Sequence, residues 1–266
     1  MKLNKLLEKI KQYRKKINCH LDIQKNIEVA SKKRVDKAHK LFNQLERDQG
    51  TSIERRKDFY DLSRDLIRTK YKLQGYLLFL ATWNFARFRY ALRDLDLNSL
   101  TKLMKGIEKK LKKYKKNNFW EMEFTKKFKE TTVEVFEKLD KIKGIEHTGS
   151  PKLMHLICPE VYVMWDQYIR NHYQFKIEKK TKNKGLKYYN FLIKMKKMFS
   201  ETKSNTKLID EYNYVFITRP HILRNNLNDL HNKLSKDLKA GKNDFPNIKK
   251  KLKRINKEIQ LITKKS

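Results

Sequence analysis

Residues that turn a chain or break a helix are scarce in this sequence. Its 266 residues include only 7 Gly and 4 Pro, too few for the many tight turns of an all-β fold. Apolar side chains make up 39% of the chain and aromatic ones 11%, so a core can form, which a disordered basic polypeptide would lack. The sequence therefore predicts an all-α fold with a packed core.

The charge balance points to an anionic partner. Lys and Arg total 65 against 30 Asp and Glu, a formal net charge of +35. Such a surface attracts polyanions at long range and speeds their encounter, which favours nucleic acid first and an anionic membrane second. The alternative is a lysine-rich solvated surface without a binding role. No signal peptide is visible, and no apolar run reaches the roughly 20 residues of a membrane span. We therefore expect an intracellular, cytoplasmic protein, nucleoid-associated if prokaryotic.

Chemistry based on metals, disulfides or nucleotide cofactors has little support. Cys19 and Cys158 lie far apart without paired spacing, and His147 and His155 lack a third ligand at zinc spacing. The glycine-rich phosphate loops and the G-x-S-x-G nucleophile motif are absent. We expect no cofactor and no metal.

Both ends of the chain have helical periodicity. Leu3, Leu7, Ile10, Ile17 and Leu21 mark one helical face in residues 1–50, predicted to be an amphipathic extension of one or two helices. Residues 221–266 carry two seams separated by a break at 239–246: Leu223, Leu227, Leu230, Leu234 and Leu238, then Ile248, Leu252, Ile255, Ile259 and Ile262. This pattern predicts a basic, antiparallel, coiled-coil-like hairpin. The terminal helices could pair with each other, with a second copy of the chain, or with DNA.

Residues 51–220 form the predicted central domain. Thr51-Ser52-Ile53-Glu54 has the pattern of a capping box that begins a helix. The following stretch to Leu97 is apolar almost all round near its middle, as expected of a central buried helix. Leu97, Leu100, Leu103, Met104 and Ile107 predict a further amphipathic helix.

A compact helical hairpin is predicted within residues 133–173. Gly144 ends a short helix, residues 145–149 form a polar connection, and Ser150-Pro151 is expected to open a second helix that Pro159 ends. An extended apolar segment, 160–165, then leads to Asp166, placed to cap the next helix.

At these residues the chain resembles the helix-hairpin-helix DNA glycosylase superfamily, which has the endonuclease III-like fold. The resemblance lies in Gly144 and the hairpin after it, in Lys152-x-x-His155-Leu156-x-x-Pro159, and in Trp165-Asp166-x-x-Ile169-Arg170. Asp210-Glu211-Tyr212-Asn213 is similar to a closing motif of such relatives. The resemblance covers residues 55–220 and is specific over 142–170. No cysteine cluster follows, which matches members that lack the iron–sulphur centre.

The resemblance implies a helix-hairpin-helix glycosylase-like core that binds double-stranded, damaged DNA. Asp166 would be the catalytic carboxylate of a monofunctional N-glycosylase, a hydrolase of the N-glycosidic bond. Trp83, Tyr162 and Trp165 would line the base pocket. The residues that would contact DNA are Lys141, Lys143, Gly144, Ile145, His147, Thr148, Gly149 and Lys152.

Two departures from the family pattern favour other interpretations. Thr148 stands where bifunctional members carry a nucleophilic lysine, so no covalent lyase chemistry is implied unless Lys152 reaches the site. Glu146 replaces a hairpin glycine and would oppose a phosphate. One alternative is a structure-selective DNA-binding module of the same fold without catalysis, in which Asp166 is only a helix cap. The other is a helical scaffold that assembles proteins through its terminal helices.

Overall fold

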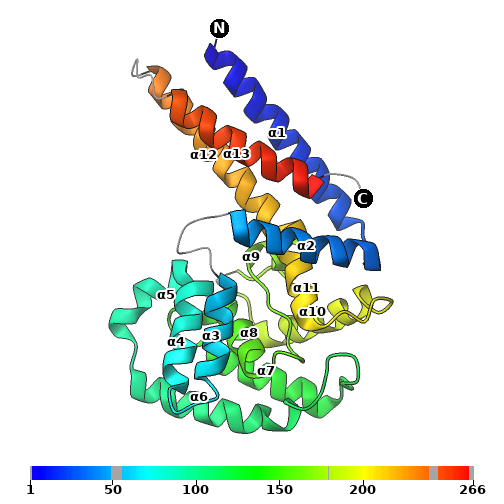
Figure 1. The fold of residues 1–266 in the computed structure, drawn as a ribbon. Coiled ribbons are helices and arrows are strands. Elements are labelled where there is room, and N and C mark those ends of the chain that lie inside the picture. Colours follow the sequence, from blue (N-terminus) through cyan, green and yellow to red (C-terminus); the bar gives the residue numbers. More distant parts are fainter. Residues whose placement is uncertain (1, 49–55, 179, 240–244, 264–266) are drawn as a thin grey trace.

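The computed structural model of the chain describes residues 2–48, 56–178, 180–239 and 245–263. All the regular secondary structure in these ranges is helical, which confirms the all-α prediction (Figure 1). The main helices are α1 (Lys2–Lys25), α2 (Lys32–Asp48), α3 (Arg56–Leu66), α4 (Lys72–Trp83), α5 (Phe85–Ala91), α6 (Leu97–Leu111), α7 (Lys126–Asp140), α8 (Glu146–Ile157), α9 (Gln167–His172), α10 (Lys184–Met198), α11 (Thr206–Asn213), α12 (Arg219–Lys239) and α13 (Phe245–Thr263). Short 3₁₀ turns, η2 (Leu92–Asp94) and η3 (Lys112–Tyr114), follow α5 and α6, and a π-helical turn, η4 (Tyr214–Thr218), joins α11 to α12.

The two ends of the chain pack together in one bundle. Figure 1 shows α12 and α13 as a helical hairpin, and α1 contacts both helices. The seam residues whose side chains the structure describes are buried in it, with Leu227, Leu234 and Ile259 fully enclosed alongside Ile10 of α1. The hairpin prediction is therefore confirmed, and α1 is a partner of the hairpin in the same chain. Self-association through these helices stays a prediction.

The apolar stretch before Leu97 is divided into shorter helices. The capping box at residues 51–54 lies outside the described part, and the expected central helix corresponds to α3, α4 and α5. Asn84 separates α4 from α5, and its side-chain Nδ2 donates a hydrogen bond of 2.7 Å to the Gly144 carbonyl. Phe79 and Leu80 of α4 are fully buried, as the apolar pattern predicts.

The second hairpin helix begins earlier than predicted. Gly144 has a φ of +86°, which suits a turn after α7, but α8 starts at Glu146 and Ser150-Pro151 lies inside it. Pro151 has no N–H to give to the His147 carbonyl one turn back. The indole Nε1 of Trp165 donates to that carbonyl instead, at 2.8 Å, so the proline is accommodated within the helix.

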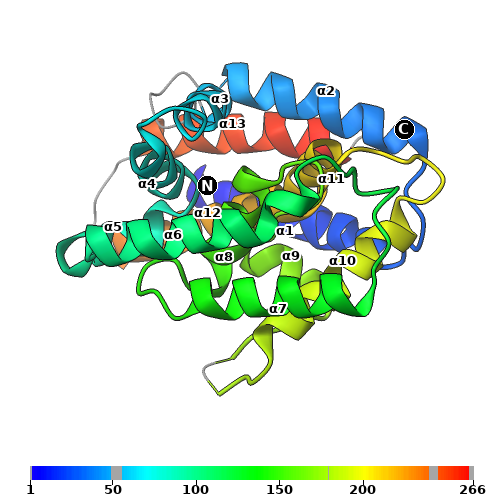
Figure 2. The ribbon, with the colours of Figure 1, turned by 90° about the horizontal axis from the view of Figure 1, so that it is seen from below.

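α8 and α11 are each packed against helices from other parts of the chain. Seen from below, α6 and α7 cross the front of the molecule, with α8 behind them (Figure 2). α7 contacts α8 and α10, while α2 contacts α11 and η4. Over the described ranges, no helix has the length and apolar character needed to cross a membrane.

Candidate active site

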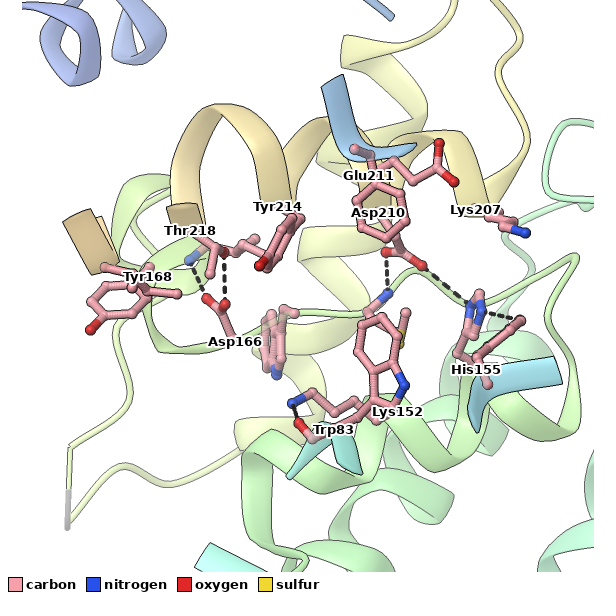
Figure 3. A pocket seen from close by; sticks show the side chains of 16 residues that line it. Trp83, Lys152, His155, Asp166, Tyr168, Lys207, Asp210, Glu211, Tyr214 and Thr218 are labelled. Atoms are coloured by element: carbon pink, nitrogen blue, oxygen red, sulfur yellow. Dashed lines mark hydrogen bonds and ion pairs between the residues drawn. The ribbon is translucent and has the colours of Figure 1, made fainter. Parts of the chain in front are cut away.

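An aromatic cavity of about 220 Å³ lies where α2, α3, α4, α8, α9, α11, η4 and α12 converge (Figure 3). Six aromatic side chains line it: Phe42, Tyr60, Trp83, Trp165, Tyr168 and Tyr214. The polar lining consists of Lys152, His155, Asp166, Lys207, Asp210, Glu211 and Thr218. Sites for drug-sized ligands usually measure about 300–1,000 Å³, so this smaller cavity suits one flat ring system.

Asp166 stands at the wall of this cavity as the N-cap of α9, as predicted. Its Oδ1 accepts a hydrogen bond of 2.8 Å from the Ile169 N–H, and its Oδ2 accepts one of 2.7 Å from the Thr218 hydroxyl. The side chain is half-buried. Since a carboxylate offers about four acceptor positions, these two bonds fix its direction and leave lone pairs for a ligand.

The three predicted base-pocket aromatics do not lie together. Trp83 and Trp165 both line the cavity, and the Trp83 ring packs against Tyr60 with centroids 6.3 Å apart. Tyr162 lies in the core away from the lining, stacked on Phe128, with its hydroxyl 3.3 Å from that of Thr132.

Lys152 is the one predicted DNA-contact residue that lines the cavity. It projects from α8, is 8% exposed, and its Nζ donates to the Trp83 carbonyl. Thr148, one turn earlier, is also buried and accepts a hydrogen bond of 3.2 Å from Arg170. The Thr148 hydroxyl, which was predicted to contact DNA, is therefore already bonded within the protein.

The hairpin glycines pack against protein. A Cβ on Gly144 would lie 2.3 Å from that of Ala91, and one on Gly149 would lie 3.0 Å from the Asn84 amide nitrogen. Ile145 is likewise fully buried. Gly144 therefore approaches α5 closely, and Gly149 approaches the α4–α5 junction at Asn84.

Two hairpin lysines remain at the surface. Lys141 and Lys143 are exposed. Together with the partly buried His147, they border a second hollow beside the hairpin. Lys143 pairs with Asp94, and His147 Nδ1 lies 3.6 Å from an Asp140 oxygen. The structure thus brings Lys141, Lys143 and His147 together, outside the lining of the aromatic cavity.

His155 lines the cavity, although the sequence analysis assigned it no role in the site. His155 is fully buried; its Nδ1 lies 2.6 Å from the Tyr162 carbonyl and its Nε2 2.8 Å from the Tyr60 hydroxyl. A carbonyl only accepts, so Nδ1 carries the hydrogen and Nε2 accepts from the tyrosine. Burial lowers the pKa of His155 to about 4, which keeps the ring neutral at pH 7.

Asp210 is another of the carboxyl groups that line the cavity. Its Oδ1 accepts a hydrogen bond of 2.7 Å from the Met164 N–H, and the side chain is 9% exposed. Burial raises the pKa of Asp210 well above its ordinary value. The Met164 hydrogen bond and the Lys152 charge act in the opposite direction and lower that pKa by less than burial raises it. The Asp210–Asn213 motif marked this segment in the sequence but assigned it no role.

Within the described ranges, no cluster of three or more His, Cys, Asp or Glu side chains is placed to hold a metal ion. Comparison with protein-family models, curated proteins and solved structures finds no match for the chain. The chemistry of the cavity and the charge of the chain are therefore the basis for assigning a function.

Proposed function

We propose that the protein binds duplex DNA and hydrolyses the N-glycosidic bond of a base turned out of the helix into the aromatic cavity. The observation that carries this proposal is the position of Asp166, a carboxyl group held in direction at the wall of an aromatic cavity of single-ring-system size. Enzymes that act on a base extrude it and read it between aromatic side chains. The resemblance at residues 142–170 leads to the same activity.

In the proposed reaction, the bond between the sugar C1′ and the base nitrogen breaks and its electron pair leaves with the base. Asp166 stabilises the positive charge that develops on the sugar and accepts a proton from the attacking water. The water oxygen forms the new bond to C1′, and a proton supplied by solvent neutralises the departing base. Because Thr148 replaces the lysine of bifunctional members, no covalent enzyme–sugar intermediate is proposed.

The proposed DNA contacts come from lysines at the surface. Lys207 is exposed and lines the cavity, while Lys141 and Lys143 lie at the surface of the hairpin. Phosphate contacts of this kind position the duplex without reading its sequence. The net charge of +35 would speed the encounter and make binding sensitive to salt.

The test is base release from duplexes that carry uracil, 8-oxoguanine, hypoxanthine or alkylated purines, with wild type and Asp166→Asn compared. Asparagine caps a helix about as well as aspartate, so the variant should keep its fold while it loses the carboxylate. Asp229→Asn, on α12, removes the same charge far along the chain from Asp166. We expect release by wild type and Asp229→Asn only, with equal or tighter DNA binding by Asp166→Asn.

Other results would select the alternatives. Salt-sensitive DNA binding without release by wild type would indicate a DNA-binding module without catalysis. Absence of DNA binding would favour the scaffold. An adduct trapped by borohydride and lost in Lys152→Ala would mean that Lys152 is a nucleophile, contrary to the proposed monofunctional reaction.

A further inference from the structure

A carboxyl group in the lining of the cavity is joined to an imidazole that reaches the surface. Oε2 of Glu211, on α11, lies 2.6 Å from Nδ1 of His39, on α2. The Glu211 side chain is 5% exposed and that of His39 is 48% exposed. Because Glu211 lines the cavity, the pair links the cavity wall to solvent across the contact between α2 and α11.

The hydrogen bonds around His39 locate the hydrogen of its ring. Asn43 follows His39 by one turn of α2, and Nδ2 of Asn43 lies 3.2 Å from His39 Nε2 and 3.0 Å from the His39 carbonyl. A carbonyl only accepts, so the amide nitrogen is the donor to both atoms. Nε2 is therefore an acceptor, the neutral ring carries its hydrogen on Nδ1, and Nδ1 donates to Glu211.

Both residues belong to helix faces that border the cavity. On α11, Glu211 follows Lys207 by four residues, and both line the cavity (Figure 3). On α2, Phe42 follows His39 by three residues and lines the cavity as well. Residues three or four apart lie on one face of a helix. The pair therefore stands at the edge of the cavity, where α2 meets α11.

Two further carboxyl groups of the lining are placed differently. Asp166 is the residue proposed to act on the sugar and on the attacking water. Asp210 accepts a hydrogen bond from the Met164 N–H with Oδ1, its Oδ2 is enclosed by protein, and the neighbouring His155 is fully buried. Glu211 is thus the carboxyl group of this lining that is bonded to a titratable ring at the surface.

We propose that Glu211 protonates the departing base and that His39 carries the proton to it from solvent. This inference rests on the proposed function and gives the route of the proton that neutralises the base. Solvent protonates His39 at Nε2, and the ring passes its Nδ1 proton to Glu211. The Glu211 acid gives this proton to the base as the electron pair of the C1′–N bond moves onto the base, and the carboxylate is restored. Glu211 is a catalytic residue in this scheme, and His39 acts through it.

The experiment compares the release of two bases that differ in their need for a proton. Hypoxanthine leaves as an anion unless it is protonated. 7-Methylguanine carries a positive charge before the bond breaks and leaves as a neutral base. General acid catalysis typically contributes about 10²–10⁴ in rate. In single-turnover assays on duplexes, Glu211→Gln should therefore release hypoxanthine about 100-fold more slowly than wild type, and 7-methylguanine at nearly the wild-type rate.

The variants are chosen to retain the contact between α2 and α11. In Glu211→Gln the amide oxygen still accepts from His39 Nδ1, and in His39→Asn the amide nitrogen still donates to Glu211. Neither amide can carry the proton, so His39→Asn should show the same dependence on the base. Glu134→Gln is the control, because Glu134 is an exposed carboxyl group paired with Lys110 and Lys138. It should release both bases as wild type does.

Chemical rescue is the second measurement. His39→Ala leaves a half-exposed gap that free imidazole can enter, and imidazole should raise the release of hypoxanthine about tenfold. Pyrazole has the same shape and also forms hydrogen bonds, but it is a much weaker base and should give no rescue. A contact that only holds α2 against α11 would be restored by either ring.

These results separate the proton relay from the proposed function. Equal slowing of both bases, or rescue by pyrazole as well as imidazole, would reject the relay and leave the hydrolase intact. Release of 7-methylguanine alone by wild type would also reject the relay, since that base needs no proton. If wild type releases hypoxanthine but not 7-methylguanine, selective rescue by imidazole supports the relay and its absence rejects it. No release by wild type from any duplex would reject the hydrolase and the relay together.

Discussion

The Thr218 hydroxyl donates a hydrogen bond of 2.7 Å to Oδ2 of Asp166 and links the π-helical turn η4 to the start of α9. π-turns are rare and occur frequently at functional sites. The Ile169 N–H holds the other oxygen, so the Asp166 carboxyl group is fixed by two elements that are far apart in the sequence. Thr218 is therefore a positioning residue for the proposed reaction.

Replacing Thr218 by valine should slow base release without weakening DNA binding. Valine matches the shape of threonine but removes the hydrogen-bond donor that orients Asp166. Losing this bond should raise the activation free energy by about 1 kcal/mol, which lowers the rate roughly fivefold to tenfold. Thr218→Ser keeps the hydroxyl and should restore most of the rate. Single-turnover release and filter binding measure the two effects, and an unchanged rate in Thr218→Val would contradict the positioning role.

Gly144→Ala should destabilise the fold. The residue has a φ of +86° and an added Cβ would lie 2.3 Å from the Ala91 Cβ, so strain and overlap together should cost about 2 kcal/mol or more. Ala91→Gly in the same chain removes the overlap and should recover part of the loss. Urea unfolding followed by circular dichroism gives the free energies.

Gly106 provides the matched control for this prediction. It lies inside α6, and an added Cβ would meet nothing within 4 Å. Gly106→Ala should therefore stabilise the chain by about 0.5–1 kcal/mol. If both glycine variants changed stability alike, backbone strain at the hairpin would not be the cause.

Acid should destabilise the protein through its buried histidines. The pKa of His155 is about 4 in the folded state, below its ordinary 6.5, so the unfolded chain binds the proton more tightly. Stability is then lost as the pH falls from about 6.5 to about 4, by about 1.4 kcal/mol per pH unit and up to about 3 kcal/mol for His155. Burial also lowers the pKa values of His20, His172 and His221 to about 4, with the same sign.

A His155→Gln variant isolates the contribution of this residue. Asp210, whose pKa is raised by burial, acts in the opposite direction as the pH falls, but it is present in both proteins. The stability advantage of wild type over the variant should therefore shrink between pH 6.5 and pH 4. Urea unfolding at half-unit steps measures the difference, and parallel curves would show that His155 is not a buried neutral ring.

Local sequence signals predicted the helices and the Asp166 cap well, because both depend on residues close in the chain. The apolar seams at Ile248–Ile262 and Leu223–Leu234 predict the hairpin. An apolar seam does not identify the element that packs against it, so the contact with α1 appeared only in the structure. The start of α8 was missed because the Trp165 indole, distant in sequence, bonds the carbonyl that Pro151 leaves free.

The cavity was less predictable than the helices. Tyr60 and His155 form a hydrogen bond although they lie 95 residues apart in the sequence, and Asp210 comes from a third element. No local sequence motif therefore predicts that these side chains lie together. Tyr162 and Trp165 lie only three residues apart, yet Trp165 lines the cavity while Tyr162 lies in the core.

The hairpin lysines should contribute to DNA affinity, and the salt dependence of binding measures that contribution. Lys141 and Lys143 lie at the surface beside the hairpin. Removing one phosphate contact lowers the slope of log affinity against log salt by about 0.9, so the double alanine variant should show a slope smaller by about 2 on an undamaged duplex. Replacing Lys9 and Lys16 of α1 by alanine removes the same charge from an exposed face of the terminal bundle and should leave the slope unchanged. An equal decrease in both variants would mean that DNA responds to the charge of the whole surface, and the hairpin would then have no specific role in binding.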